Sequence, residues 1–147
     1  IDLLETRLVL EIEVARLAAV RRSERDLEEL EKAVRMMEKD IEAGGVGLKC
    51  DNYFHEVLAN AASNKVLQEF VSLCGNLLEV EREDHLRNQE GEPQRALQQH
   101  KQILDAIREK DSGRAQRLME EHLLKPSEII RLNGKRESSA GPPSDSE

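Results

Sequence analysis

Apolar side chains recur every three or four residues along most of this chain, which is the spacing of one face of an α-helix. Between about residues 2 and 21, one such stripe consists of Leu3, Leu10, Val14 and Leu17. The next begins after Ser23, a residue that suits a helix N-cap, and ends at glycines 44 to 47. The pattern therefore predicts an all-α protein whose apolar stripes pack against one another.

The composition of the 147 residues supports helices and excludes several functions. Aromatic residues make up 2% of the chain and tryptophan is absent, which is not typical of a β-sandwich or barrel. The formal net charge of −8 disfavours nucleic-acid binding by this chain alone, because phosphate contacts dominate such binding. No apolar run approaches the ~20 residues that a membrane span needs.

Four more helices are expected after residue 47. The third begins near Lys49, Asn64 caps the fourth, Pro93 lies in the first turn of the fifth, and Asp111 or Ser112 caps the sixth. The fourth helix is expected to bury its apolar residues, which are Val66, Leu67, Phe70, Val71, Cys74, Leu77, Leu78 and Leu86.

The two ends of the chain carry separate expectations. Pro126 is expected to break or kink the last helix, and residues 127–132 to add a last turn or two. Polar residues, glycine and proline dominate from Asn133 on, so residues 1–132 are expected to form the folded domain and residues 133–147 a disordered tail. The chain starts at Ile1 inside a helical pattern, which indicates a fragment. Cys50 and Cys74 form no C-x-x-C motif and read as free thiols in a reducing compartment, the cytoplasm.

Asp51 and His55 are the first candidates for chemistry. They are four residues apart, so on a helix their side chains lie on one face, one turn from each other. A carboxylate and an imidazole at that spacing can bind one divalent metal ion. Such a pair is weak evidence alone, because most such pairs lie on solvated polar faces.

His100 and His122 strengthen the metal hypothesis through their register. Each is eleven residues from Asp111, and each falls on the apolar face of its helix. A short turn at Asp111 implies an antiparallel pair of helices, so the two histidines should face each other about 16 Å from the turn. The alternative is a pair of hydrogen-bonded core histidines without a metal.

Two further polar residues allow contrasting interpretations. Arg7 falls within the first apolar stripe, where it either extends its head to water or lies buried against a carboxylate. His85 sits among Glu83, Asp84 and Arg87, and these neighbours predict a solvated histidine.

Taken in order, the motifs resemble the FCD effector-binding domain of the FadR-like branch of GntR-family bacterial transcription regulators. The resemblance covers about residues 2 to 124, and the opening is especially similar to lactate- and pyruvate-responsive members. It rests on Glu5-x-Arg7-x-x-x-Glu11, Asp51-x-x-Phe54-His55, Asn64-x-x-Leu67, His100-x-x-Ile103-x-x-Ala106-Ile107, and Ala115 with Met119-x-x-His122-Leu123.

This resemblance implies an antiparallel bundle of six or seven helices around a central metal and ligand cavity. It implies a divalent metal held by Asp51, His55, His100 and His122, with zinc expected and nickel or manganese as alternatives. A small organic acid, such as the hydroxy acid lactate or a ketoacid, is expected on or near the metal. Arg7 matches the arginine that faces the acid, and Arg82 is a weaker candidate.

The same resemblance implies partners outside the chain. A winged helix-turn-helix domain is expected to precede residue 1 and to supply DNA binding, and the effector-binding domain is expected to form a homodimer. No membrane association is expected.

Two rival functions stay open from the residues. A metal with open positions could activate water in an enzyme, but the chain has no H-E-x-x-H motif and no identifiable catalytic base. A metal-free helical interaction module with buried histidines is the other rival. Metal content and turnover of organic acids separate the three.

Overall fold

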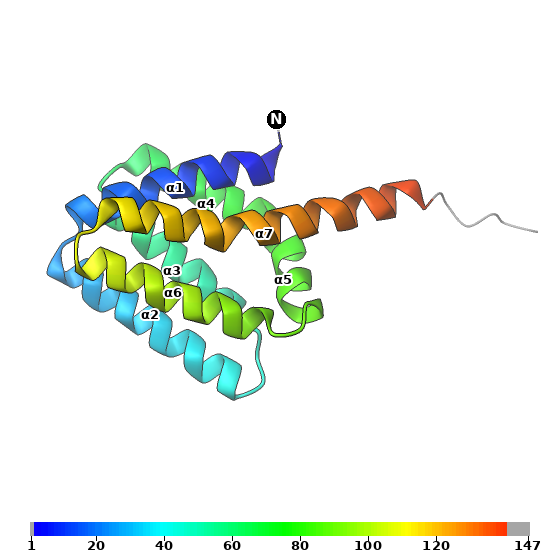
Figure 1. Ribbon diagram of the computed structural model, residues 1–147, viewed down its shortest axis with the longest axis horizontal. Coiled ribbons are helices and arrows are strands. Elements are labelled where there is room, and N and C mark those ends of the chain that lie inside the picture. The colour runs from blue at the N-terminus through cyan, green and yellow to red at the C-terminus, as the bar shows by residue number, and fades with distance from the viewer. Residues whose placement is uncertain (1, 141–147) are drawn as a thin grey trace, which may run out of the picture.

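The computed structural model describes residues 2–140, and within them seven α-helices form a bundle (Figure 1). The predicted all-α class is therefore confirmed. The helices are α1 (Leu3–Arg21), α2 (Glu24–Glu42), α3 (Leu48–Ala61), α4 (Lys65–Leu77), α5 (Glu79–Asn88), α6 (Glu92–Arg108) and α7 (Ser112–Ser139).

Helices distant in sequence pack side by side. Helix α1 lies along α7, the longest of the seven, and α6 returns antiparallel to α7 through a short turn (Figure 1). Helix α3 packs between α1 and α2 and also contacts α4. Helix α5 closes one end of the bundle, where it contacts α6 and α7.

Side-chain caps begin several helices at the residues that the sequence indicates. Ser23 and Asp26 form a capping box at the start of α2, with Ser23 Oγ accepting from Asp26 N at 3.0 Å. Asn64 accepts from the backbone of α4, and Asp111 accepts from Arg114 N at the start of α7. These caps fix where the chain turns, and therefore which residues of α6 and α7 lie opposite each other.

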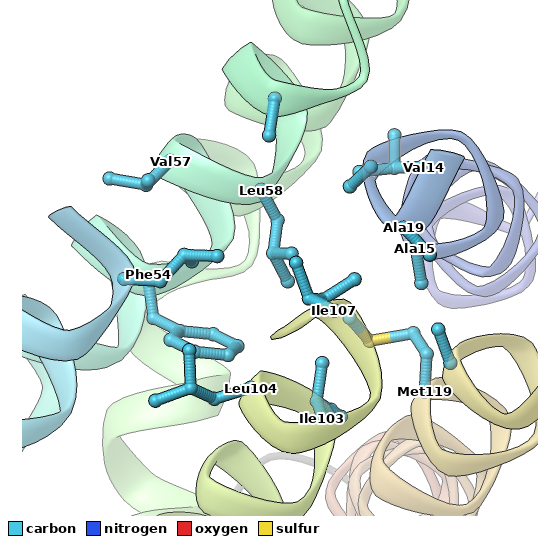
Figure 2. Packing of buried hydrophobic residues seen from close by; sticks show 14 of the residues in the cluster. Val14, Ala15, Ala19, Phe54, Val57, Leu58, Ile103, Leu104, Ile107 and Met119 are labelled. Atoms are coloured by element: carbon cyan, nitrogen blue, oxygen red, sulfur yellow. The ribbon is translucent and has the colours of Figure 1, made fainter. Parts of the chain in front are cut away.

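The apolar core fills the end of the bundle that contains the α6–α7 turn. Phe54, Leu58, Ile103, Ile107 and Met119 each expose less than 2% of their surface. Figure 2 shows Met119 beside Ile107, with Val14, Ala15 and Ala19 of α1 on the neighbouring side. Residues from α1, α3, α6 and α7 thus share one apolar cluster.

Helix α4 departs from the expected pattern. Val71, Cys74 and Leu78 are buried as predicted, but the prediction was wrong for three other residues, because Val66, Phe70 and Leu77 expose 65%, 51% and 58% of their surface. The helix carries apolar residues on two faces, and the bundle covers only one of them. The chain also bends at Leu78, so one expected helix is observed as two, α4 and α5.

The C-terminal helix also differs from expectation. Helix α7 passes through Pro126 and continues to Ser139, so residues 133–139 are helical rather than disordered. Proline has no N–H, and the carbonyl of His122 therefore loses its donor four residues on. Arg95 Nη2 lies 3.4 Å from that carbonyl and replaces the donor. The rest of the predicted tail, residues 141–147, lies outside the described residues.

No helix within residues 2–140 combines the length and the apolar sequence that a bilayer span requires.

Candidate metal centre

Three helices bring Asp51, His55, His100 and His122 together in the interior. Asp51 and His55 lie one turn apart on α3, His100 comes from α6 and His122 from α7. All four side chains are buried, and one potential ligand atom from each lies within 4.8 Å of the others. The four residues that were predicted to bind the metal therefore lie together in one cluster.

The spacing of these atoms suits a single small cation. His100 Nε2 lies 2.8 Å from Asp51 Oδ1 and 3.2 Å from His122 Nε2. His55 Nε2 lies 3.4 Å from Asp51 Oδ1 and 3.4 Å from His122 Nε2. Ligands about 2.1 Å from a zinc ion are about 3.4 Å apart in a tetrahedron and about 3.0 Å apart in an octahedron. The observed separations fall close to these values.

Partners outside the cluster orient two of the rings. His122 Nδ1 lies 2.7 Å from Oε1 of Gln99, and His55 Nδ1 lies 2.6 Å from Oε1 of Glu11, although this second contact is not aligned as a good hydrogen bond. A proton on each Nδ1 is favoured by these acceptors, which leaves each Nε2 with a lone pair facing the cluster. Metal-binding histidines in proteins commonly have such partners.

Outside the cluster, His100 is held by packing rather than by a polar partner. Its ring is completely buried and stacks on Phe54 with ring centres 4.1 Å apart and planes 7° apart. Its Nδ1 has no hydrogen-bond partner among the described residues. Three Nε2 atoms and a carboxylate oxygen converge at this point. Two imidazole nitrogens that face each other can form a hydrogen bond only if one of them carries a proton. One cation can bind the lone pairs of all four atoms, and it therefore satisfies these atoms more completely than hydrogen bonds do.

Two buried arginines flank the cluster. Arg7 Nε pairs with Glu11 at 2.8 Å, and Arg82 pairs with Asp51. Both guanidinium groups are buried, since Arg7 exposes 7% and Arg82 exposes 5% of its surface. Of the two interpretations of Arg7, the structure therefore favours the buried guanidinium against a carboxylate.

The surroundings set the charges of these groups. Burial alone raises the pKa of Asp51, but Arg82 and His55 outweigh it and hold that pKa well below its usual range. Burial opposes ionisation of Glu11 as well, yet Arg7 and His55 lower its pKa to about 2. Burial lowers the pKa of His122, and the neighbouring His100 and His55 lower it further. Both carboxylates are therefore ionised, while His122 is neutral and able to bind a metal.

A small cavity adjoins the cluster. It has a volume of about 40 Å³, and its walls include Arg7, Asp51, Arg82 and His122. Its other walls come from α5, the start of α6 and the part of α7 that follows Pro126. His85 and Ile130 also line a larger groove of about 420 Å³ between α5 and the end of α7. The cavity and the groove therefore adjoin each other at these two residues.

The prediction that His85 is solvated was wrong. Only 6% of His85 is exposed, and its Nε2 lies 3.1 Å from Oε1 of Glu92. Its charged neighbours in sequence point elsewhere, because the bend at Leu78 turns α5 so that Arg82, His85 and Leu86 face inward.

Sequence reasoning missed several residues around the site. Glu11 was noted only as part of a motif, although its position four residues after Arg7 signals an ion pair on one helix face. Glu92, Arg95 and Gln99 were not singled out. Arg95 Nε lies 2.9 Å from Glu92 and its Nη1 lies 2.5 Å from Gln99, so these three residues connect the His85 side of the cavity to His122.

The chain is similar to known proteins over most of its length. The sequence profile of the FCD domain family matches residues 2–125. The chain is 36% identical to the HTH-type transcriptional regulator LutR of Bacillus subtilis, covering 88% of this chain and 61% of LutR. It is 30% identical to the galactonate operon transcriptional repressor of Escherichia coli, covering 76% of this chain and 49% of that protein. The chain thus spans about half to three-fifths of these relatives.

A solved structure gives the same result for the fold. The GntR protein of Streptococcus agalactiae superposes with a TM-score of 0.74 at 30% sequence identity, covering 89% of this chain and 57% of that one. Both relatives named above are transcription regulators, which supports the prediction that this domain is not an enzyme.

Proposed function

This chain belongs to the FCD domain family, and from that premise we propose that it is the ligand-sensing domain of a GntR-type transcription regulator that binds a divalent metal and a small organic acid. The observation that carries the proposal is the buried cluster of one aspartate and three histidines. Buried ionisable groups without a function are costly, so such a cluster needs a reason to persist.

Asp51, His55, His100 and His122 would hold the metal. Three imidazole nitrogens and one carboxylate oxygen suit zinc best, and nickel or manganese also accepts such a set. When bound, the ion supplies a Lewis-acid anchor for a carboxylate or hydroxyl oxygen. Glu11 and Gln99 orient two of the imidazoles toward it.

Arg7 and Arg82 would bind the acid. Both guanidinium groups line the cavity next to Asp51 and His122, and a planar guanidinium matches a carboxylate in geometry and charge. The cavity has room for about three waters, which suits an acid of three or four carbons such as lactate. One relative is named as the repressor of a galactonate operon, and galactonate is itself a hydroxy acid.

Regulation would follow from the helices that surround the acid. The cavity is lined by α1, α5, α6 and α7, so an acid that contacts them favours one packing of these helices over another. A ligand shifts such an equilibrium by its difference in affinity for the two states. DNA binding would come from a winged helix-turn-helix domain that precedes this one in the whole regulator.

An exposed apolar stripe supports a homodimer. Four residues of α4 that share one helix face expose more than half of their surface, namely Val66, Phe70, Leu73 and Leu77, and Val80 of α5 is exposed just beyond the bend. Contiguous apolar surface of this kind favours association, and a twofold dimer lets one stripe pack against its copy.

Elemental analysis tests the metal centre. We expect about one equivalent of divalent metal in the purified chain after exposure to Zn²⁺, and little in His100→Ala. His85→Phe is the matched control, since it removes a buried histidine that is not in the cluster and should leave the metal in place. A parent chain without metal would overturn the proposal, and turnover of an organic acid would favour an enzyme instead.

Sedimentation analysis tests the dimer. Phe70→Glu should convert a dimer to a monomer by burying a charge in the apolar interface. Leu132→Glu is the control, because Leu132 is equally exposed but lies on α7 away from the stripe. A parent chain that is monomeric at all concentrations would refute this part of the proposal.

A further inference from the structure

The wall of the cavity contributed by α5 contains a buried histidine that the metal centre does not use. Neither ring nitrogen of His85 has an aligned hydrogen-bond partner among the described residues, although Glu92 Oε1 lies 3.1 Å from Nε2. Burying an imidazole without good partners costs free energy. His85 and Glu92 both line the cavity, so a molecule inside it lies against these two residues.

Helix geometry places His85 at a defined distance from the arginine end of the cavity. His85 follows Arg82 by three residues on α5, which is a rise of about 4.5 Å along the helix. Glu92 precedes His100 by eight residues on α6, a rise of about 12 Å. The cavity therefore has an arginine and metal-ligand end at Arg82 and His122, and a second polar end at His85 and Glu92.

We propose that His85, held beside Glu92, is a second recognition point that selects acids carrying a hydroxyl group at the end opposite their carboxylate. This inference rests on the proposed function, since it takes the carboxylate to lie against Arg7 and Arg82. An extended chain advances about 1.2 Å per bond, so the terminal oxygen of a four-carbon acid lies about 5 Å from its carboxyl carbon. That length is similar to the rise of about 4.5 Å between the backbone positions of Arg82 and His85 along α5.

The chemistry of the pair favours a hydroxyl over other groups. A proton on Nε2 of His85 is attracted by Glu92, which leaves Nδ1 as a hydrogen-bond acceptor. A hydroxyl can donate to Nδ1, whereas a carboxylate offers only acceptors and a methyl group offers neither. A second carboxylate would also lie near the carboxylate of Glu92, and like charges repel.

The structure also holds this pair in place. Oε2 of Glu92 accepts from Arg95 Nε at 2.9 Å, which fixes the side of the carboxylate that faces away from His85. A recognition point held from behind in this way loses little conformational entropy when the ligand binds. The alternative is that the His85–Glu92 contact only ties α5 to α6 and does not read the ligand.

A series of three acids of equal length separates these interpretations. Binding of 4-hydroxybutanoate, butanoate and succinate to the zinc-loaded chain would be measured by calorimetry. We expect 4-hydroxybutanoate to bind about fivefold to tenfold more tightly than butanoate, the factor that one buried hydrogen bond provides, and more tightly than succinate. Equal affinities for 4-hydroxybutanoate and butanoate, or the tightest binding by succinate, would overturn the inference.

His85→Phe identifies the residue responsible. This variant keeps a ring of similar size, so it should bind butanoate within about twofold of the parent and lose the preference for the hydroxyl. A preference that persists in folded His85→Phe would overturn the role of His85. Should this variant not fold, as judged by circular dichroism, Glu92→Gln is used instead. It keeps the shape of Glu92, and it should strengthen succinate relative to butanoate, while an unchanged ratio would count against the pair.

Failure of the proposed function gives a different result. A chain that binds no zinc, or a zinc-loaded chain that binds none of the three acids, refutes the sensor proposal itself. A chain that binds zinc and all three acids equally keeps the sensor and refutes only the second recognition point.

Discussion

The two ends of the bundle are built from the same helices and have opposite chemistry. Helix α3 carries Phe54 next to His55, and α7 carries Met119 one turn before His122. Figure 2 shows buried apolar side chains of α1, α3, α6 and α7 packed together at one end. At the other end, Glu11, Asp51 and two arginines are buried together with the three histidines.

The difference separates folding from binding. Apolar burial stabilises the fold whether or not a ligand is present, whereas a buried ion pair gains little over its cost of desolvation. Helices α1, α3, α6 and α7 are therefore anchored by the apolar cluster and present the buried polar groups elsewhere along their length. A metal ion bound there would repay that cost, so the two ends should respond to opposite perturbations.

Metal removal should give the largest change in the free energy of unfolding, and this change should depend on the residues of the polar end alone. At a free Zn²⁺ concentration a thousand times the dissociation constant, we expect the free energy of unfolding to rise by about 4 kcal/mol over the chelated protein. The same concentration of Zn²⁺ should change the free energy of unfolding of His122→Ala very little. Urea unfolding with and without chelator measures both values, and equal responses of the two proteins would exclude a centre that includes His122.

Truncation of a side chain in the apolar core should give the next largest effect. Ile107→Ala should lower the free energy of unfolding by about 3 kcal/mol, because Ile107 is completely buried and the change leaves a cavity. The amount of metal bound per folded molecule should not change. Val20→Ala on the exposed side of α1 is the control and should cost less than about 0.5 kcal/mol. Loss of metal in Ile107→Ala would show that the two ends are not independent.

Acid should weaken the polar end of the metal-free protein. Arg7 and His55 outweigh burial and hold the pKa of Glu11 at about 2, below its value in the unfolded chain. A lowered pKa stabilises the fold above the unfolded pKa, near 4.3, and this contribution is lost as the pH falls toward 2. Between pH 6 and pH 3 the parent should therefore lose about 2 kcal/mol more than Glu11→Gln. Equal losses in chelator would contradict the assignment.

The smallest effect is expected outside the cluster, at Gln99. Gln99→Leu removes the acceptor for Nδ1 of His122, and loss of such a partner typically weakens metal binding about tenfold or more. Gln98→Leu is the matched control, because Gln98 is the exposed neighbour on the same helix. Competition with a chromophoric chelator measures both affinities. An unchanged affinity in Gln99→Leu would remove Gln99 from the site.

Two pairs within the cluster could be anticipated because each depends on local geometry, whereas the meeting of the two pairs was implied only by the resemblance to FCD domains. Asp51 and His55 share a helix face by spacing alone, and the capped turn at Asp111 places His100 opposite His122. The sequence pattern and one short turn are sufficient for this, and the observed Nε2 separation of 3.2 Å agrees with the predicted register. Helix periodicity likewise predicted the all-α fold.

Other features depend on contacts between distant segments and could not be anticipated. The bend at Leu78 turns His85 inward despite its charged neighbours. Helix α4 has apolar residues on two faces, and only packing decides that Val71 is buried while Phe70 is not. Pro126 lies within α7, where Arg95, thirty-one residues earlier, bonds the carbonyl that the proline leaves free.

Pro126 also makes α7 easier to bend at that residue. A missing backbone hydrogen bond lowers the bending stiffness of a helix where it is lost. Ile130, in the wall of the cavity, lies about 6 Å beyond this pivot, and Ser139 lies about 20 Å beyond it. If the part of α7 after Pro126 moves as a rigid rod about that residue, a displacement of Ile130 by a bound molecule would be about three times larger at Ser139, and His122 would not move.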